Sequence, residues 1–254
     1  MKVREIYDII DRFAPFNIAM THDNPGLLVG RGENEVTRVL VTLDADQTAM
    51  ERAIKEGCEL ILSHHPFIFE GEAHVSDRTP QGRKLLFALE NRLNIISAHT
   101  NLDSCEGGIN DTLGALLGLE VTDKFVPTNN GAFLGRIGRH RFASPEAFIE
   151  NAGKVLGVTP RYVLGEKFER IAWVSGSGTS CMEEAIEAGA DALVTGDCKY
   201  SAFMNAREAG IGLIDLGHFE TEQIIVPVMA KYLRENGLEV IEHLIPSPIK
   251  TIGE

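Results

Sequence analysis

The sequence has little of what secreted, membrane-spanning or zinc-finger proteins depend on. Its four cysteines are scattered and form no Cys-x-x-Cys pair, which argues against both a disulfide framework and a zinc finger. No stretch approaches the roughly 18 uninterrupted apolar residues of a membrane span. Charged residues also stand near the N-terminus, where a signal peptide would carry its apolar run. We therefore expect reduced thiols, no membrane partner and a cytoplasmic protein.

Positive charge is scarce as well. The 254 residues include 24 lysines and arginines against 37 aspartates and glutamates, a formal net charge of -13. An acidic chain repels nucleic acid and anionic membranes, so neither is an expected partner. The short cluster of Arg136, Arg139 and Arg141 is expected to form a solvated surface. A phosphorylated substrate would need local positive charge, which bound metal ions can supply.

What is present is a globular composition, 44% hydrophobic and 24% charged, with an internal repeat. Residues 50–63 resemble residues 182–195, and each copy has a helix, a glycine that ends it (Gly57 or Gly189) and a strand. A further strand precedes each helix, and this alternation predicts βαβ units. We predict an α/β fold of two related lobes with mostly parallel sheets. The lobes comprise residues 1–127 and 128–254, with the C-terminal segment packing back on the first lobe.

Six side chains with the chemistry of metal ligands follow the ends of predicted strands. They are His64, His65, His99, Asp103, His218 and Glu222. The carboxyl ends of parallel strands are where sites form in such sheets, so these side chains can converge. Imidazole and carboxylate groups together are typical ligands of divalent metals. The pattern therefore predicts a divalent-metal site with room for two ions.

Each motif also has a plainer interpretation. The His64-His65 pair, taken alone, is more typical of a surface turn, and Asp103 of a helix cap. His99 is the least certain ligand and can instead orient a ligand or a water. The glycine-rich stretch 175–180 lacks the lysine of a P-loop, which favours a tight turn over a phosphate-binding loop.

Five stretches carry a resemblance to a known family. They are HDNPGLLVG at 22–30, SHHPFIF at 63–69, SAHTNLD at 97–103, EAGADALVTGD at 187–197 and GHFETE at 217–222. In these stretches the chain resembles the GTP cyclohydrolase 1 type 2 homologues, also called the NIF-three-like family. The stretches run in the family's order over nearly the full length.

The resemblance implies a two-lobed α/β subunit with a dinuclear metal centre between the lobes, assembled into a toroidal homohexamer. It implies that His64, Asp103 and Glu222 hold one ion, and that His65, His218 and Glu222 hold the other. Two departures stand out. His22 replaces a residue that is usually aromatic, and the loop that begins Glu70-Gly71-Glu72 is acidic where relatives often carry a basic residue.

These observations predict a metal-dependent hydrolase. Two divalent ions per subunit would activate water, and His99 would act as a general acid or base. The ligand set does not choose among zinc, iron and manganese. The family name implies a nucleotide, GTP, as the small-molecule substrate. Two alternatives stay open: a phosphoesterase or nucleotidase with the same metals, and a non-catalytic regulatory or scaffold hexamer.

Overall fold

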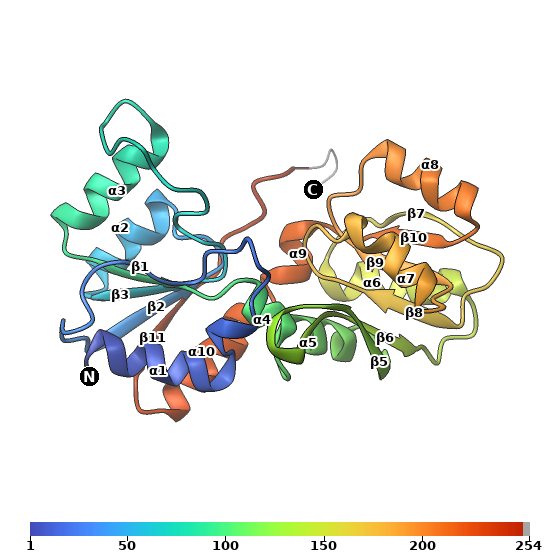
Figure 1. Cartoon of the computed structure of the whole chain (residues 1–254), viewed down its shortest axis with the longest axis horizontal. Coiled ribbons are helices and arrows are strands. Elements are labelled where there is room, and N and C mark those ends of the chain that lie inside the picture. The colour runs from blue at the N-terminus through green and yellow to red at the C-terminus, as the bar shows by residue number, and fades with distance from the viewer. Residues whose placement is uncertain (251–254) are drawn as a thin grey trace. The chain divides into compact units, whose positions relative to one another are not determined.

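The computed structural model describes residues 1–250, and the chain forms two compact units (Figure 1). Unit 1 comprises Met1–Leu102 and Ile225–Ile245. Unit 2 comprises Asp103–Ile224 and the segment that begins at Pro246. The chain thus returns to unit 1 after it has built most of unit 2. The predicted lobes, residues 1–127 and 128–254, are proposed as folding domains. Compact units need not coincide with folding domains, so the two lobes stay a prediction.

Unit 1 is a five-stranded sheet with helices on both faces. Its elements are α1 (Val3–Phe13), η1 (Phe16–Ile18), β1 (Gly26–Val29), β2 (Arg38–Thr42), α2 (Gln47–Lys55), β3 (Leu60–Ser63), α3 (Pro80–Glu90), β4 (Asn94–Ser97), α10 (Ile225–Glu235) and β11 (Glu239–His243). The strand order is β1-β4-β3-β2-β11, and only the pairing of β1 with β4 is antiparallel among those described. Helices α2 and α3 cover one face, and α1 and α10 the other (Figure 1). Strands buried on both faces explain the continuous apolar runs in the sequence.

Local signals in the sequence set the helix boundaries in unit 1. The Asp46 side chain caps α2 by accepting a hydrogen bond from the Ala49 amide at 2.8 Å. Thr79 caps α3 in the same way through the Gly82 amide. Gly57, just beyond α2, has a φ of 69°, the left-handed conformation that ends a helix and that the sequence predicts.

Unit 2 contains a six-stranded sheet with strand order β5-β6-β8-β9-β10-β7. The remaining elements are α4 (Thr100–Ser104), α5 (Ile109–Leu116), β5 (Glu120–Pro127), η2 (Asn129–Gly131), β6 (Phe133–Arg139), α6 (Pro145–Leu156), β7 (Arg161–Val163), β8 (Arg170–Trp173), η3 (Thr179–Cys181), α7 (Met182–Glu187), β9 (Ala192–Thr195), α8 (Tyr200–Ala209), β10 (Gly212–Asp215) and α9 (His218–Glu222). Two apolar clusters form its core, one around Leu193 and one around Trp173.

The repeat appears as the same unit in both sheets, β2-α2-β3 and β8-α7-β9, each with a parallel pair of strands. Gly189 has a φ of 77°, which matches the role of Gly57. The prediction of mostly parallel sheets is nevertheless wrong for unit 2, where β5, β6 and β7 pair antiparallel with their neighbours. The short turn at Asn130 and Gly131, both with positive φ, joins β5 and β6 as a hairpin.

The expectation that Arg136 belongs to a solvated surface is also wrong. Its side chain is 0% exposed, whereas Arg139 and Arg141 lie at the surface as predicted. The guanidinium donates to Asp111 Oδ1 at 2.5 Å and to the carbonyls of Ser104 and Cys105 at 3.2 and 3.0 Å. A buried arginine is tolerated because its donors are matched by a carboxylate and several carbonyls. Arg136 is therefore a structural residue that holds the segment after α4.

Composition also led to expectations about the cysteines and about membrane-spanning segments. All four cysteines are buried and none forms a disulfide. Burial raises the pKa of the Cys105 thiol to about 12, which favours its protonated form. Within residues 1–250, no helix has both the length and the apolar character that a bilayer crossing requires.

Candidate metal site

His64 and His65 lie directly after β3, at the carboxyl edge of the parallel strands of unit 1. The His64 amide donates to the Thr42 and Leu43 carbonyls, and the His65 amide donates to the Leu43 carbonyl. These bonds tie the dipeptide to the end of β2. Pro66 follows at once, so the strand ends here and both imidazoles can leave the sheet on one side. The surface-turn interpretation fails for His64, which is only 2% exposed.

The hydrogen bonds of His64 and His65 indicate which ring nitrogen carries the proton in each neutral imidazole. His64 Nδ1 lies 2.9 Å from the Ala98 carbonyl oxygen, which can only accept, so Nδ1 carries the proton in the neutral ring. His65 Nδ1 lies 2.8 Å from Asp44 Oδ1, which orients that ring in the same way. Each neutral ring then has its lone pair on Nε2, the arrangement found in metal-binding histidines.

Asp44 is a partner that the sequence interpretation missed. It follows β2, the strand beside β3, so its position at the end of a neighbouring strand was a signal for it. His99 occupies the corresponding place after β4, and its ring centroid lies 5.1 Å from that of His64 and 6.0 Å from that of His65. Unit 1 therefore brings three of the predicted histidines together.

His99 has a carboxylate partner of its own in unit 1. Its Nδ1 lies 2.7 Å from Asp23 Oδ1, and the Thr100 amide donates to Asp23 Oδ2 at 3.0 Å. The Asp23 side chain is 2% exposed. Burial acts to raise its pKa, but the hydrogen bonds and charge of His99 and the bonds from Thr100 prevail and lower the pKa to about 2. Asp23 was also missed, although it stands beside His22, which is exposed.

In unit 2, the short helix α9 carries His218 and Glu222 on one face, as the spacing of four predicts. His218 Nε2 lies 2.9 Å from Glu222 Oε2, and His218 Nδ1 lies 2.7 Å from Asp197 Oδ2. The hydrogen bond to Glu222 is the main reason that the pKa of His218 rises to about 9, against the opposing effect of burial. His218 therefore lies between two carboxylates, and both of them favour its protonated form.

Asp103, the remaining predicted ligand, is buried in unit 2 and is 6% exposed. Its Oδ1 accepts a hydrogen bond from the Ser175 hydroxyl at 3.2 Å. The glycine-rich stretch that contains Ser175 is a tight turn, as predicted. The amides of Ser175, Gly176 and Gly178 donate to side chains of unit 2, so they do not form a phosphate-binding loop.

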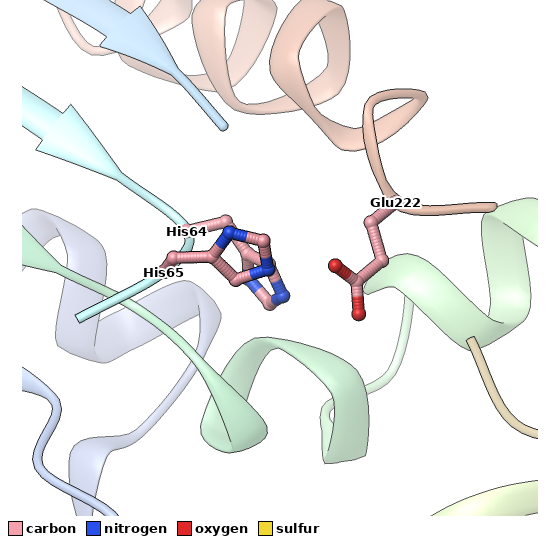
Figure 2. Close-up of side chains that lie close together, drawn as sticks. All are labelled: His64, His65 and Glu222. Atoms are coloured by element: carbon pink, nitrogen blue, oxygen red, sulfur yellow. The ribbon is translucent and has the colours of Figure 1, made fainter. Parts of the chain in front are cut away.

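One group of side chains has the geometry of a metal site. One ligand atom each of His64, His65 and Glu222 lies within 4.8 Å of the others, and this group could hold a metal ion (Figure 2). Two imidazoles with assigned Nε2 lone pairs and one carboxylate fit zinc, iron or manganese. The group contains three of the five predicted ligands. The assignment of Asp103 as a further ligand of one ion and of His218 as a further ligand of the other stays a prediction.

Beside His218, unit 2 also has a cavity of about 680 Å³, which is large enough for a small organic molecule. Phe219 and Leu156 contribute apolar surface, and Arg161 and Lys250 contribute positive charge. The charge on Arg161 is balanced by Asp215, with which it forms an ion pair. The carboxylates Asp197, Asp215 and Glu220 line the same cavity, so it combines an apolar wall with groups of both charges.

Comparisons with known proteins place the chain among proteins of one family. A sequence model described as Duf34/NIF3 (NGG1p interacting factor 3) matches residues 1–248. A Clostridium perfringens protein named "GTP cyclohydrolase 1 type 2 homolog" is 35% identical over 257 residues, covering 98% of both chains. Reduced HcgD from Methanocaldococcus jannaschii has a TM-score of 0.84 at 31% identity, covering 95% of this chain and 97% of that one. A Staphylococcus aureus hypothetical protein has a TM-score of 0.87 at 26% identity, covering 99% of both.

Proposed function

Because this chain belongs to the Duf34/NIF3 family, we propose that it is a metal-dependent hydrolase that acts on a small molecule. The observation that carries the proposal is the group of His64, His65 and Glu222, with both imidazoles oriented by partners on Nδ1. Side chains oriented in this way are preorganised for a divalent ion, since no further rotation is needed to present the lone pairs.

We propose two ions per subunit, with Glu222 shared between them. His64 and Asp103 would complete the ligands of one, and His65 and His218 those of the other. A bound pair of divalent ions supplies positive charge that activates water and polarises the substrate. His218 must release its proton to take part, and Asp197 on Nδ1 is placed to keep the ring oriented when it does.

His99 is the proposed general acid or base. Asp23 holds its Nδ1 at 2.7 Å, so the proton that moves during the reaction is the one at Nε2. Asp23 also fixes the plane of the ring, because its second oxygen is held by the Thr100 amide. The pair resembles the histidine and carboxylate that cooperate in other hydrolases, in which the carboxylate sets the tautomer.

The proposed substrate class is a nucleotide or a related small anion. The relatives' name points to GTP, and the cavity beside His218 offers an apolar wall for a base. Both acidic and basic side chains line this cavity, so the bound metal ions would supply the positive charge that a phosphorylated substrate needs. A phosphoesterase with the same metals remains the second candidate, because two-metal sites suit displacement at phosphorus. Release of formate from GTP would support the cyclohydrolase reaction, and release of phosphate would support the phosphoesterase.

We also propose an oligomeric state and a cellular location for the protein. The resemblance to the NIF-three-like family supports a toroidal homohexamer, and the reduced, buried cysteines support a cytoplasmic protein. Light scattering of the purified protein would give the mass of the assembly, and a monomeric mass would contradict the hexamer.

The first experiment compares metal content in wild type, Glu222→Ala and Glu220→Ala, each purified without added metal or chelator. Glu220 lies on the same helix and is not a member of the metal group, so it is the matched control. We expect about two ions per chain in wild type and in Glu220→Ala, and loss of one or both in Glu222→Ala. Little metal in folded wild-type protein would overturn the hydrolase proposal in favour of the scaffold.

A further inference from the structure

Ser175 has an unusual position in the turn after β8. Its side chain is buried, and its hydroxyl donates to Asp103 Oδ1 at 3.2 Å. This is a bond from a neutral hydroxyl to a carboxylate, which constrains the rotation of that carboxylate. Ser177, two residues further on, is exposed, and no hydrogen bond of its side chain is recorded among the described residues. The two serines of one turn therefore differ in their relation to Asp103.

Asn110 on α5 holds Ser175 and Asp103 together. It is 0% exposed, and its Oδ1 accepts from the Ser175 amide at 2.8 Å. Its Nδ2 donates to the Leu134 carbonyl at 2.9 Å and to the Asp103 carbonyl at 3.3 Å. Both amide protons and the carbonyl oxygen of the side chain are thus used. Aspartate has no protons to donate there and leucine has no polar group, so only a carboxamide matches these three partners.

The same turn also reaches α9. The Gly176 amide donates to Thr221 Oγ1 at 3.0 Å, and Thr221 is fully buried. Gly176 has a φ of 64°, and a methyl group added there would overlap Glu222 Oε1. Residues 175 and 176 therefore contact both segments of unit 2 that carry proposed carboxylate ligands, Asp103 on one side and Glu222 on the other.

We propose that Ser175 and Asn110 are positioning residues for the Asp103 carboxylate. The turn that contains Ser175 would then set the position of this carboxylate relative to α9. This inference rests on the proposed function, because it assigns Asp103 to the metal site. Removing a residue that orients a metal ligand typically lowers the metal affinity by roughly 10- to 100-fold. The Ser175 hydroxyl holds Asp103 Oδ1 and so keeps the carboxylate plane from rotating away from the orientation that binding requires.

The test measures zinc affinity by competition with a chelator at fixed pH. We expect Ser175→Ala to weaken zinc binding by roughly 10- to 100-fold, while Ser177→Ala stays close to wild type. Ser175→Thr keeps the hydroxyl and should restore most of the affinity. Thermal unfolding of each metal-free variant shows that the fold is retained.

A second measurement separates positioning from a general structural role. If Ser175 acts through Asp103, the loss caused by Ser175→Ala should disappear in an Asp103→Asn background, because the carboxylate it orients is gone. Equal zinc affinity in Ser175→Ala and Ser177→Ala would overturn this inference and leave the hydrolase proposal standing, as would an undiminished loss in the Asp103→Asn background. Absence of zinc binding in wild type would overturn both.

Discussion

At the scale of single residues, the candidate site depends on carboxylates that are partners of histidines. Asp44, Asp23 and Asp197 each lie within 2.8 Å of a histidine Nδ1. In each case the partner fixes one ring nitrogen and so orients the imidazole. The site therefore consists of oriented imidazoles, and its chemistry depends on residues that are not themselves ligands.

Asp23 gives a prediction about stability and pH. Its pKa in the folded protein is about 2, below the ordinary 3.8, so its charged form is favoured by folding. Such a group contributes its stability above the ordinary pKa and loses it as the pH falls from about 5 towards 2. We expect Asp23→Asn to be less stable than wild type by about 1–2 kcal/mol at pH 6, and the difference to shrink by about 1 kcal/mol at pH 3.

Urea unfolding of the chelator-treated proteins at the two pH values measures this difference. Asp8→Asn is the control, because Asp8 is exposed on α1. It should differ from wild type by less than about 0.5 kcal/mol at both pH values. A difference between Asp23→Asn and wild type that does not change with pH would contradict the prediction.

At the scale of elements, the turns at strand ends carry the site. Parallel strands β2, β3 and β4 deliver Asp44, the two adjacent histidines and His99 to one edge of unit 1. In unit 2 the turn after β8 contacts Asp103 and α9. Such turns have little freedom, because their amides already donate to carbonyls or side chains of the same unit. The elements therefore preorganise the ligands before any metal binds.

The close approach of Gly176 to Glu222 can be tested by Gly176→Ala. The positive φ alone should cost about 1 kcal/mol, and the methyl group should also displace the Glu222 carboxylate. Gly189→Ala is the matched control, because Gly189 has a φ of 77° with no atom within 4 Å of an added methyl. We expect both metal-free variants to lose the stability that the positive φ costs, and Gly176→Ala to lose more because a buried carboxylate must move. Only Gly176→Ala should lose metal content. Full metal content in Gly176→Ala would be the contrary result.

At the scale of the whole molecule, the chain enters unit 1, builds unit 2 and returns to unit 1 with α10 and β11. The proposed ligands are also spread along the chain, at positions 64, 65, 103, 218 and 222. A metal whose ligands are far apart in the sequence would bind the folded chain in preference to the unfolded one. Metal binding should then contribute to the stability of the protein as a whole.

Metal removal tests this linkage. Free zinc at about 100 times its dissociation constant should stabilise the folded protein by about 2.7 kcal/mol, which is a rise of roughly 5–10 °C in the midpoint of thermal unfolding for a chain of this size. The comparison is between chelator-treated and zinc-supplemented samples. Glu222→Ala should show little of this rise, whereas Glu220→Ala should show all of it. An equal rise in Glu222→Ala would assign the effect to zinc bound elsewhere.

By itself the sequence determined the βαβ units, the glycine helix ends and the positions of His64, His65 and Glu222, because these follow from local periodicity and from short spacings. The placement of His218 and Glu222 on one face of a helix also follows from a short spacing, because the two residues are four positions apart. Only the tertiary structure decided that Arg136 is buried, that unit 2 has a mixed sheet, and that Asp23 pairs with His99. Asp23 and His99 are 76 residues apart, and no local pattern encodes which of 37 acidic residues will meet a given histidine. That choice is made by strand order and packing, which bring distant segments together only when the chain has folded.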